Sequence, residues 1–286
     1  MERKVKTLGF VNVDKPSGMT SSAVVNRVKR LTGLPCGHMG TLDPLASGVL
    51  PVGTGNAARL FDYFLQKEKE YVAEFVFGAT SDTLDTTGEL VPCGEVPGEE
   101  AVAAVLPRFV GEIDQIPPRY SAKNVGGRRG YELARAGVEF ELPPKRVTVY
   151  SFAFLGRSEE RPDAYRFRIR CGGGTYIRSL ARDVGAALGT GCVMSALRRT
   201  QSGFFRIGDA VPFDALGEEN IEDVIVPTEM VLPFPPLVLE ESSRAFNGLA
   251  VRAEAPDGKY KAFRGAEFYG IAEVRGGRAK IVTKLC

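Results

Sequence analysis

The chain has 286 residues, of which 44% are hydrophobic and 25% charged, and its formal net charge is +2. This composition is typical of a globular protein, and the length accommodates one substantial domain together with a small one. No apolar run approaches the ~20 residues of a membrane span, and the charged amino terminus does not lead into a secretory signal, so we expect a cytoplasmic protein without membrane contact.

The first third of the chain is expected to combine strands with one helix. Apolar residues between Thr20 and Leu31 recur at helical spacing; Thr20 or Ser21 is placed to cap the start and Gly33 to end the helix. Residues 71–77 alternate with period two, which predicts a strand. Further elements are expected as a strand at 9–13 and helices near 99–106 and 131–136.

The most regular strand is predicted at 165–171, where apolar residues alternate with arginines, so that one face is core and the other cationic. Three glycines at 172–174 end it, and Thr175 is placed to cap a helix running from Ile177 to Leu188. Another strand is expected at 147–154.

The last part of the chain is expected to fold separately. The proline-rich stretch 227–236 is typical of a linker, and short strand-like runs separated by glycines follow it. Strands and helices mix along the whole chain without the regular βαβ alternation of a parallel sheet. We therefore expect an α+β fold with a small β-rich domain at the carboxyl end.

Charge is unevenly distributed. Residues 161–206 contain nine arginines against two aspartates, and residues 119–146 contain seven basic residues against three acids. Such segregation favours a polyanion-binding face, although a solvated surface of mixed charge fits these counts equally well.

The sequence gives little support for a metal site or for disulfide bonds. The five cysteines are scattered without any C-x-x-C pair, and His38 is the only histidine. These facts argue against a disulfide framework, a cysteine-rich zinc site and a multi-histidine metal centre. Any catalysis is expected to rely on other side chains, without a metal.

The most unusual segment is 37–50, which reads G-H-M-G-T-L-D-P-L-A-S-G-V-L. Its glycines permit tight turns, and Pro44 restricts Asp43 to an extended conformation. The apolar neighbours would make an unpaired carboxylate costly unless a cation lies nearby. By itself the segment favours a turn aspartate that is bonded to its own backbone.

This segment resembles the signature of the bacterial tRNA pseudouridine-55 synthases, the TruB family. Other family-like blocks follow in the same order, so that the resemblance covers about residues 8–205. They are Lys69-Glu70-Tyr71 and the segments 78–88, 117–123, 131–135, 143–146 and 174–180.

The resemblance implies roles for individual residues. Asp43 would be the nucleophile, Tyr71 would stack on an extruded uracil, and Arg178 would pair with Asp43. A guanidinium suits the last role because it keeps a carboxylate ionised and orients it through paired hydrogen bonds. The remaining pocket positions would be His38, Tyr176 and Leu197.

The resemblance also implies an architecture and a partner. We expect a pseudouridine-synthase fold with a mixed, largely antiparallel sheet flanked by helices over residues 1–228, including an RNA-clamping insertion at 118–145. A small β-rich, PUA-like RNA-binding domain is expected at 229–286. The substrate would be the T stem-loop of tRNA, bound by a monomer without an obligatory protein partner. Isomerising a uridine needs no redox change and no group donor, so no cofactor is expected.

Several alternatives stay open from the sequence. Residues 53–58 imitate a G-x-G-x-x-A dinucleotide fingerprint, but Pro51 precedes them and no βαβ repeat follows. An RNA-binding or folding-assistance protein with a non-catalytic pocket is a second reading, and a guide-RNA-dependent relative of the archaeal and eukaryotic type is a third. Within the enzyme reading, Asp43 could attack either C1′ of the ribose or C6 of the uracil.

Overall fold

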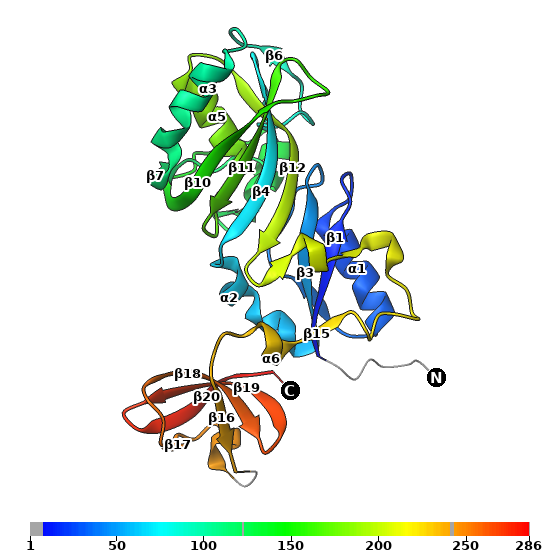
Figure 1. The fold of residues 1–286 in the computed structure, drawn as a ribbon, viewed down its shortest axis with the longest axis vertical. Coiled ribbons are helices and arrows are strands. Elements are labelled where there is room, and N and C mark those ends of the chain that lie inside the picture. Colours follow the sequence, from blue (N-terminus) through cyan, green and yellow to red (C-terminus); the bar gives the residue numbers. More distant parts are fainter. Residues whose placement is uncertain (1–7, 122, 241–242, 286) are drawn as a thin grey trace.

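Two β-sheets organise the chain (Figure 1), which is described here as a computed structural model covering residues 8–121, 123–240 and 243–285. The large sheet consists of β1 (Gly9–Lys15), β2 (Cys36–His38), β3 (Ser47–Thr54), β4 (Lys69–Phe77), β7 (Gly111–Gln115), β10 (Lys145–Arg157), β11 (Ala164–Cys171), β12 (Cys192–Ser202), β13 (Phe205–Arg206), β14 (Val211–Pro212) and β15 (Ile225–Pro227). The small sheet consists of β16 (Pro236–Leu239), β17 (Val251–Arg252), β18 (Gly258–Arg264), β19 (Glu267–Arg275) and β20 (Arg278–Lys284).

Short elements complete the fold. The α-helices are α1 (Ser21–Thr32), α2 (Phe61–Leu65), α3 (Glu99–Val105), α4 (Gly130–Arg135), α5 (Ile177–Ala187) and α6 (Thr228–Val231). Two hairpins lie outside the main sheets: β5 (Ala79–Thr80) with β6 (Val91–Pro92), and β8 (Asn124–Val125) with β9 (Arg128–Arg129).

The large sheet runs β14-β1-β3-β12-β4-β11-β10-β7 along its main path, and β2, β13 and β15 pair at its flanks. Only the β1–β14 and β3–β12 pairs are parallel, and the other pairs are antiparallel. This mixed, largely antiparallel sheet with flanking helices confirms the expected α+β fold class.

The helix ends test the capping predictions. Thr20 accepts a bond from the Ala23 backbone N–H at 3.1 Å, and Gly33 ends α1 in the left-handed region at φ 68°, both as expected. The expected cap of α5 is wrong, because Tyr176 is the N-cap residue. The Thr175 hydroxyl instead donates to the carbonyl of Gly172 at 3.0 Å, within the turn that the three glycines form.

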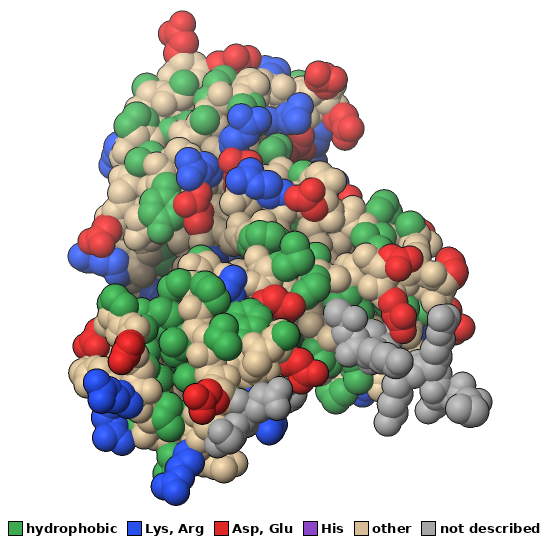
Figure 2. All heavy atoms as spheres, turned by 60° about the horizontal axis from the view of Figure 1, so that its bottom comes forward, with side chains coloured by type: hydrophobic (Ala, Val, Ile, Leu, Met, Phe, Trp, Pro, Cys, Tyr) green, Lys and Arg blue, Asp and Glu red, His purple; other side chains and the backbone are tan. Residues whose placement is uncertain are grey.

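The two faces of the central strands differ. One face carries Tyr71, Ile169 and other buried apolar residues, which pack with α3 and α5 in one core. Because side chains alternate along a strand, Arg166, Arg168 and Arg170 lie on the opposite, exposed face. The arginines of segment 161–206 therefore do not share one surface. On the face shown in Figure 2, Lys and Arg side chains are interleaved with acidic ones.

The small sheet is attached to the large one by an apolar cluster. Val231, Leu232 and Ile271 pack there with Leu60 and Phe64 around α2. The expected domain boundary after residue 228 falls inside α6, one residue after the end of β15, which pairs with β1. Among the described residues no helix is long and apolar enough to span a membrane.

Candidate active site

Asp43 lies in the loop between β2 and β3, where a tight turn fixes its direction. Its carbonyl accepts a bond from the Ala46 N–H at 3.0 Å, with Pro44 as the second residue of the turn. The preceding residue, Leu42, is buried and exchanges two bonds with the Ser21 hydroxyl, at 2.8 and 2.9 Å. The backbone on both sides of the carboxylate is thus held against α1 and the core.

The far end of this loop is fixed to β12. Gly48 has φ 100°, and a Cβ there would lie 2.2 Å from the carbonyl oxygen of Arg199, so only glycine fits. The Arg199 side chain is fully buried, and its Nε donates to the Val49 carbonyl at 2.7 Å while Nη2 donates to the Gly40 carbonyl at 3.1 Å. One guanidinium therefore bonds to both sides of the loop that carries Asp43.

Asp43 and Arg178 form a two-point ion pair. Arg178 Nε lies 2.9 Å from Asp43 Oδ2, and Nη2 donates to Oδ1 at 3.2 Å. The arginine side chain is only 6% exposed, whereas the aspartate side chain is 36% exposed. The guanidinium thus belongs to the protein interior, and the carboxylate keeps an open side that a substrate can approach.

The same guanidinium is fixed by three further groups. Its Nη1 donates to the Thr83 carbonyl at 2.8 Å and lies 3.6 Å from Asp85 Oδ2, and its Nη2 donates to the Tyr120 carbonyl at 2.9 Å. Asp85 is buried and also accepts bonds from the hydroxyls of Thr83 and Thr87. The sequence reasoning did not single out Asp85, although it lies within the family-like block 78–88.

Gln115 holds the start of α5. Its side-chain oxygen accepts from the Tyr176 N–H at 2.8 Å, and its side-chain nitrogen donates to the Tyr176 carbonyl at 3.1 Å. One residue further along the chain, the Ile116 carbonyl accepts from Ser179 at 2.8 Å and from Arg182 at 3.1 Å. The segment that leads into the insertion is therefore bonded to the helix that carries Arg178. Gln115 was likewise missed from sequence.

Tyr71 and Leu197 lie on the buried face of the sheet, on the neighbouring strands β4 and β12. They are 7% and 8% exposed. Burial raises the pKa of Tyr71 to about 12, even though the positive charge of Arg199 acts in the opposite direction. The phenol is therefore neutral at physiological pH. Burial also raises the pKa of Tyr176, which lies partly buried just before α5.

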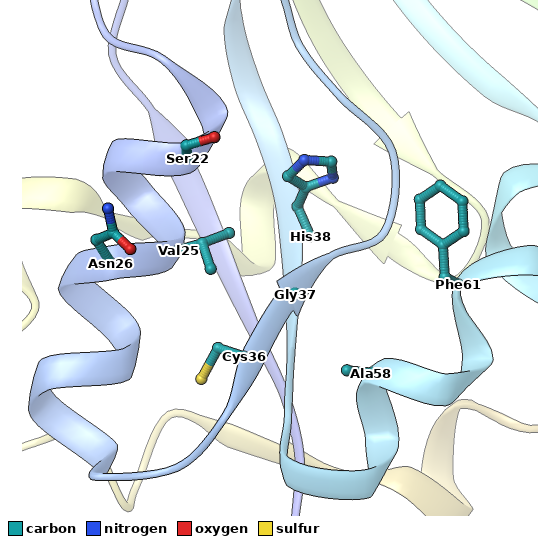
Figure 3. Close-up of a pocket in the computed structure, with 8 residues that line it drawn as sticks. All are labelled: Ser22, Val25, Asn26, Cys36, Gly37, His38, Ala58 and Phe61. Atoms are coloured by element: carbon teal, nitrogen blue, oxygen red, sulfur yellow. The ribbon is translucent and has the colours of Figure 1, made fainter. Parts of the chain in front are cut away.

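His38 borders an open cavity of about 420 Å³ (Figure 3). The cavity lies between α1 and the turn before α2, and Asp43 is not among its lining residues, which are Ser22, Val25, Asn26, Cys36, Gly37, His38, Ala58 and Phe61. Burial lowers the pKa of His38, and the charge of Arg199 lowers it further. Its Nδ1 is buried without a hydrogen-bond partner among the described residues.

The candidate residues are thus distributed over two adjoining places. Asp43 and Arg178 are in direct contact, and Tyr71 and Leu197 share the neighbouring buried sheet face. His38 lies beside its own cavity, on the strand that leads into the Asp43 loop. Over the described ranges of the chain, no three His, Cys, Asp or Glu side chains come together as they would around a metal ion.

Solved structures share this architecture. A Cbf5-Nop10-Gar1 complex contains a chain that aligns with a TM-score of 0.71 and 28% identity, covering 99% of this chain and 88% of that one. An H/ACA RNP bound to a substrate RNA aligns with a TM-score of 0.67 and 26% identity, over 97% and 85% of the two chains. The fold is that of a pseudouridine synthase. The profile of the TruB family pseudouridylate synthase N-terminal domain matches residues 29–177, and that of the tRNA pseudouridylate synthase B C-terminal domain matches 178–233. The chain belongs to the TruB family.

Curated relatives match over nearly the whole chain. The tRNA pseudouridine synthase B of Clostridium kluyveri is 38% identical over 286 residues, which cover 96% of this chain and 98% of that protein. The protein of the same name from Caldanaerobacter subterraneus is 41% identical, over 85% and 86% of the two chains. These matches confirm the resemblance found in the sequence.

Proposed function

We propose that this protein converts uridine 55 in the T loop of tRNA to pseudouridine, using Asp43 as the nucleophile on an extruded nucleotide. The proposal takes its substrate from the relatives named tRNA pseudouridine synthase B, which match the chain almost end to end. The observation that carries it is the Asp43–Arg178 pair, in which a buried guanidinium holds a carboxylate whose other side is open.

The reaction can proceed by attack at C1′. A carboxylate oxygen of Asp43 forms a bond to C1′, the N1–C1′ bond breaks, and its electron pair stays on the uracil, which becomes an anion. The base then turns, C5 bonds to C1′, and the ester bond breaks to restore the carboxylate. C5 loses its proton and N1 gains one, so atoms and charge balance. Attack at C6 also gives a covalent intermediate, and both routes need the same ionised aspartate.

The neighbouring residues then have distinct tasks. Arg178 orients the Asp43 carboxylate through its two-point contact. Tyr71 offers a neutral aromatic surface on which the extruded base stacks, which recovers about 1–3 kcal/mol of the cost of unstacking it from the RNA. Leu197 and Tyr176 complete the walls of the uracil pocket, and His38 contacts the loop beside the extruded nucleotide.

RNA contact extends beyond the pocket. The insertion 118–145 clamps the RNA backbone, and its root already touches the site: the Tyr120 carbonyl bonds Arg178, and the Tyr120 hydroxyl donates to Asp82 at 3.0 Å. Residues 1–228 act as the catalytic domain and 229–286 as a small RNA-binding domain. The enzyme works in the cytoplasm as a monomer, without a metal or an organic cofactor.

The test uses the proton that leaves C5. A tRNA transcript labelled with tritium at C5 of uridine releases tritium to water with each turnover, and the modified position is then mapped on the product. We expect Asp43→Asn to abolish release, while Asp209→Asn, an exposed aspartate, keeps the wild-type rate. Persistent release by Asp43→Asn contradicts the nucleophile assignment, and release from a position other than 55 contradicts the substrate assignment.

A guide-dependent enzyme is the alternative that the neighbours from H/ACA complexes suggest. The same assay distinguishes the two functions, because the purified protein must act on the transcript with no added protein or guide RNA. Activity only in the presence of a guide would favour the alternative.

A further inference from the structure

Lys69 is a buried cation that the proposed reaction does not use. The residue is 5% exposed, and its ammonium donates to the carbonyls of Leu65 and Lys67, both at 2.7 Å, and of Phe64 at 3.2 Å. These carbonyls belong to α2 and to the turn after it, where helix geometry leaves carbonyl groups without a donor. Burying an ammonium is costly, and here all three of its donors hold one short segment.

The side chains of Lys69 and Tyr71 share the buried face of β4. The two residues lie two apart on the strand, and side chains alternate between its faces. Lys69 pairs with Cys171 of β11 and with Ser202 of β12, so the sheet holds its backbone from both sides. The ammonium therefore fixes α2 against the end of the strand from which Tyr71 projects.

The end of α2 also touches the turn that leads to Arg178. A Cβ on Gly173 would collide with the carbonyl oxygen of Leu65, so the turn of three glycines packs directly on α2. The same carbonyl oxygen lies 2.7 Å from the Lys69 ammonium. The turn continues into α5, whose first turn carries Arg178. The Leu65 carbonyl therefore lies between the strand of Tyr71 and the segment that leads to the helix of Arg178.

We propose that Lys69 is a positioning residue of the uracil pocket: by holding the end of α2 between β4 and the glycine turn, it sets the distance between the Tyr71 ring and the nucleophile. The inference rests on the proposed function, in which Tyr71 stacks on the extruded base. A stacked base reacts only where the ring holds it at bonding distance from Asp43, so a shift of the ring by about 1 Å slows the reaction. A residue that served only the fold would not act through Tyr71.

A double-mutant cycle at pH 7 tests the proposal. Burial lowers the pKa of Lys69 to about 8, and the charge of Arg199 acts in the same direction, so the side chain is mostly protonated at this pH. Lys69→Met removes the three donors at similar size, and Tyr71→Leu removes the stacking ring. Single-turnover tritium release and tRNA affinity are measured for each variant and for the combination.

The two changes should not act independently. Lys69→Met should slow release by about tenfold or more, with tRNA affinity changed by less than about threefold. Tyr71→Leu should also slow release, because the base loses its stacking partner. In the Tyr71→Leu background, Lys69→Met should slow release by less than about threefold more, since no ring is left to position. If the two losses multiply, or if Lys69→Met weakens affinity as much as it slows release, the proposal is wrong.

The control is Lys67→Met, at a lysine whose ammonium lies 4.0 Å from the centroid of the Tyr63 ring. It should keep the wild-type rate within about twofold. A lower melting temperature for Lys69→Met together with a wild-type rate would mean that Lys69 serves only the fold, which contradicts the proposal. If Lys69→Met does not fold, Lys69→Gln, which keeps an N–H donor, takes its place in the cycle. If neither variant folds, Lys69 is a requirement of the fold, and the proposal is wrong.

The outcome also separates this inference from the function on which it rests. A wild-type protein that releases no tritium from tRNA defeats the proposed function, and the inference falls with it. An active wild-type protein with independent, multiplying losses defeats only the role of Lys69.

Discussion

The side-chain amide of Gln115 makes two hydrogen bonds with the backbone of Tyr176: it donates to the carbonyl at 3.1 Å and accepts from the N–H at 2.8 Å. Tyr176 is the N-cap residue of α5, and Arg178 lies in the first turn of that helix. Gln115 ends β7, just before the insertion begins. One amide thus positions both the helix that carries Arg178 and the start of segment 118–145, the proposed RNA clamp.

Gln115→Glu should slow catalysis while preserving the fold. The replacement has the same shape, but it puts a carboxylate oxygen against the Tyr176 carbonyl, where an N–H now donates. We expect single-turnover release to fall by about tenfold or more, since displacement of a catalytic group by even 1 Å is costly, with little change in RNA affinity. Gln66→Glu, at an exposed glutamine, is the control. If Gln115→Glu keeps the wild-type rate, the two hydrogen bonds between Gln115 and Tyr176 do not position Arg178.

Arg178→Lys should lose most turnover with only a modest loss of RNA binding. A lysine ammonium is a point charge and cannot reach both oxygens of Asp43 together with the carbonyls of Thr83 and Tyr120. We expect the rate to fall by about 100-fold and the affinity by less than about fivefold, measured on the same transcript. Equal losses in rate and affinity would instead assign Arg178 to RNA binding.

The sequence predicted the local structure of this protein more successfully than it predicted the tertiary contacts. Apolar periodicity located the central strands and α1, and Thr20 and Gly33 fixed the ends of that helix. The cap of α5 was missed because the Thr175 hydroxyl is taken by the glycine turn, which a linear pattern does not show.

The residues of the candidate site also fall into those that the sequence indicated and those that it did not. The family resemblance named the Asp43–Arg178 pair, which the structure brings into contact. Asp85 and Gln115 carried no local signal, because each acts on a residue that is distant along the chain. Arg198 and Arg199 looked alike within one basic run, yet strand alternation sends the first to solvent and the second into the core.

RNA affinity should fall steeply as salt rises, because bound phosphates release their counterions. The slope of log affinity against log salt concentration should show whether segment 118–145 contacts the RNA. Arg128→Ala, an exposed residue of the insertion, should reduce the slope of log affinity against log salt by about one if it neutralises a phosphate. Arg168→Ala is the matched control, because it removes an arginine from the exposed face of the sheet, opposite the site. A change with Arg168→Ala but not with Arg128→Ala would place the RNA on the wrong side of the sheet for this proposal.

Lys15 should make stability depend on pH in alkaline solution. Its ammonium is fully buried and donates to the carbonyls of Met19 at 2.6 Å, Pro16 at 2.8 Å and Pro44 at 3.4 Å. Burial lowers its pKa from 10.5 to about 8; Asp43 raises the pKa and Arg199 lowers it, and burial dominates. Between these two pH values the unfolded chain binds more protons at this residue than the folded protein does. Its contribution to the free energy of unfolding therefore rises with pH from about 8 to about 10.5 and is constant below 8.

The measurement is urea unfolding of the wild type and of Lys15→Met at pH 7.5 and at pH 10, because every other titrating group cancels in the difference between the two proteins. The stability of the wild type relative to the variant should increase by about 2 to 3 kcal/mol over this interval, at 1.36 kcal/mol for each unit of pKa difference. A difference that stays constant would mean that Lys15 titrates as an ordinary surface lysine. The hydrogen bond from Lys15 to the carbonyl of Pro44, the residue after Asp43, would then not come from the buried ammonium that the structure shows.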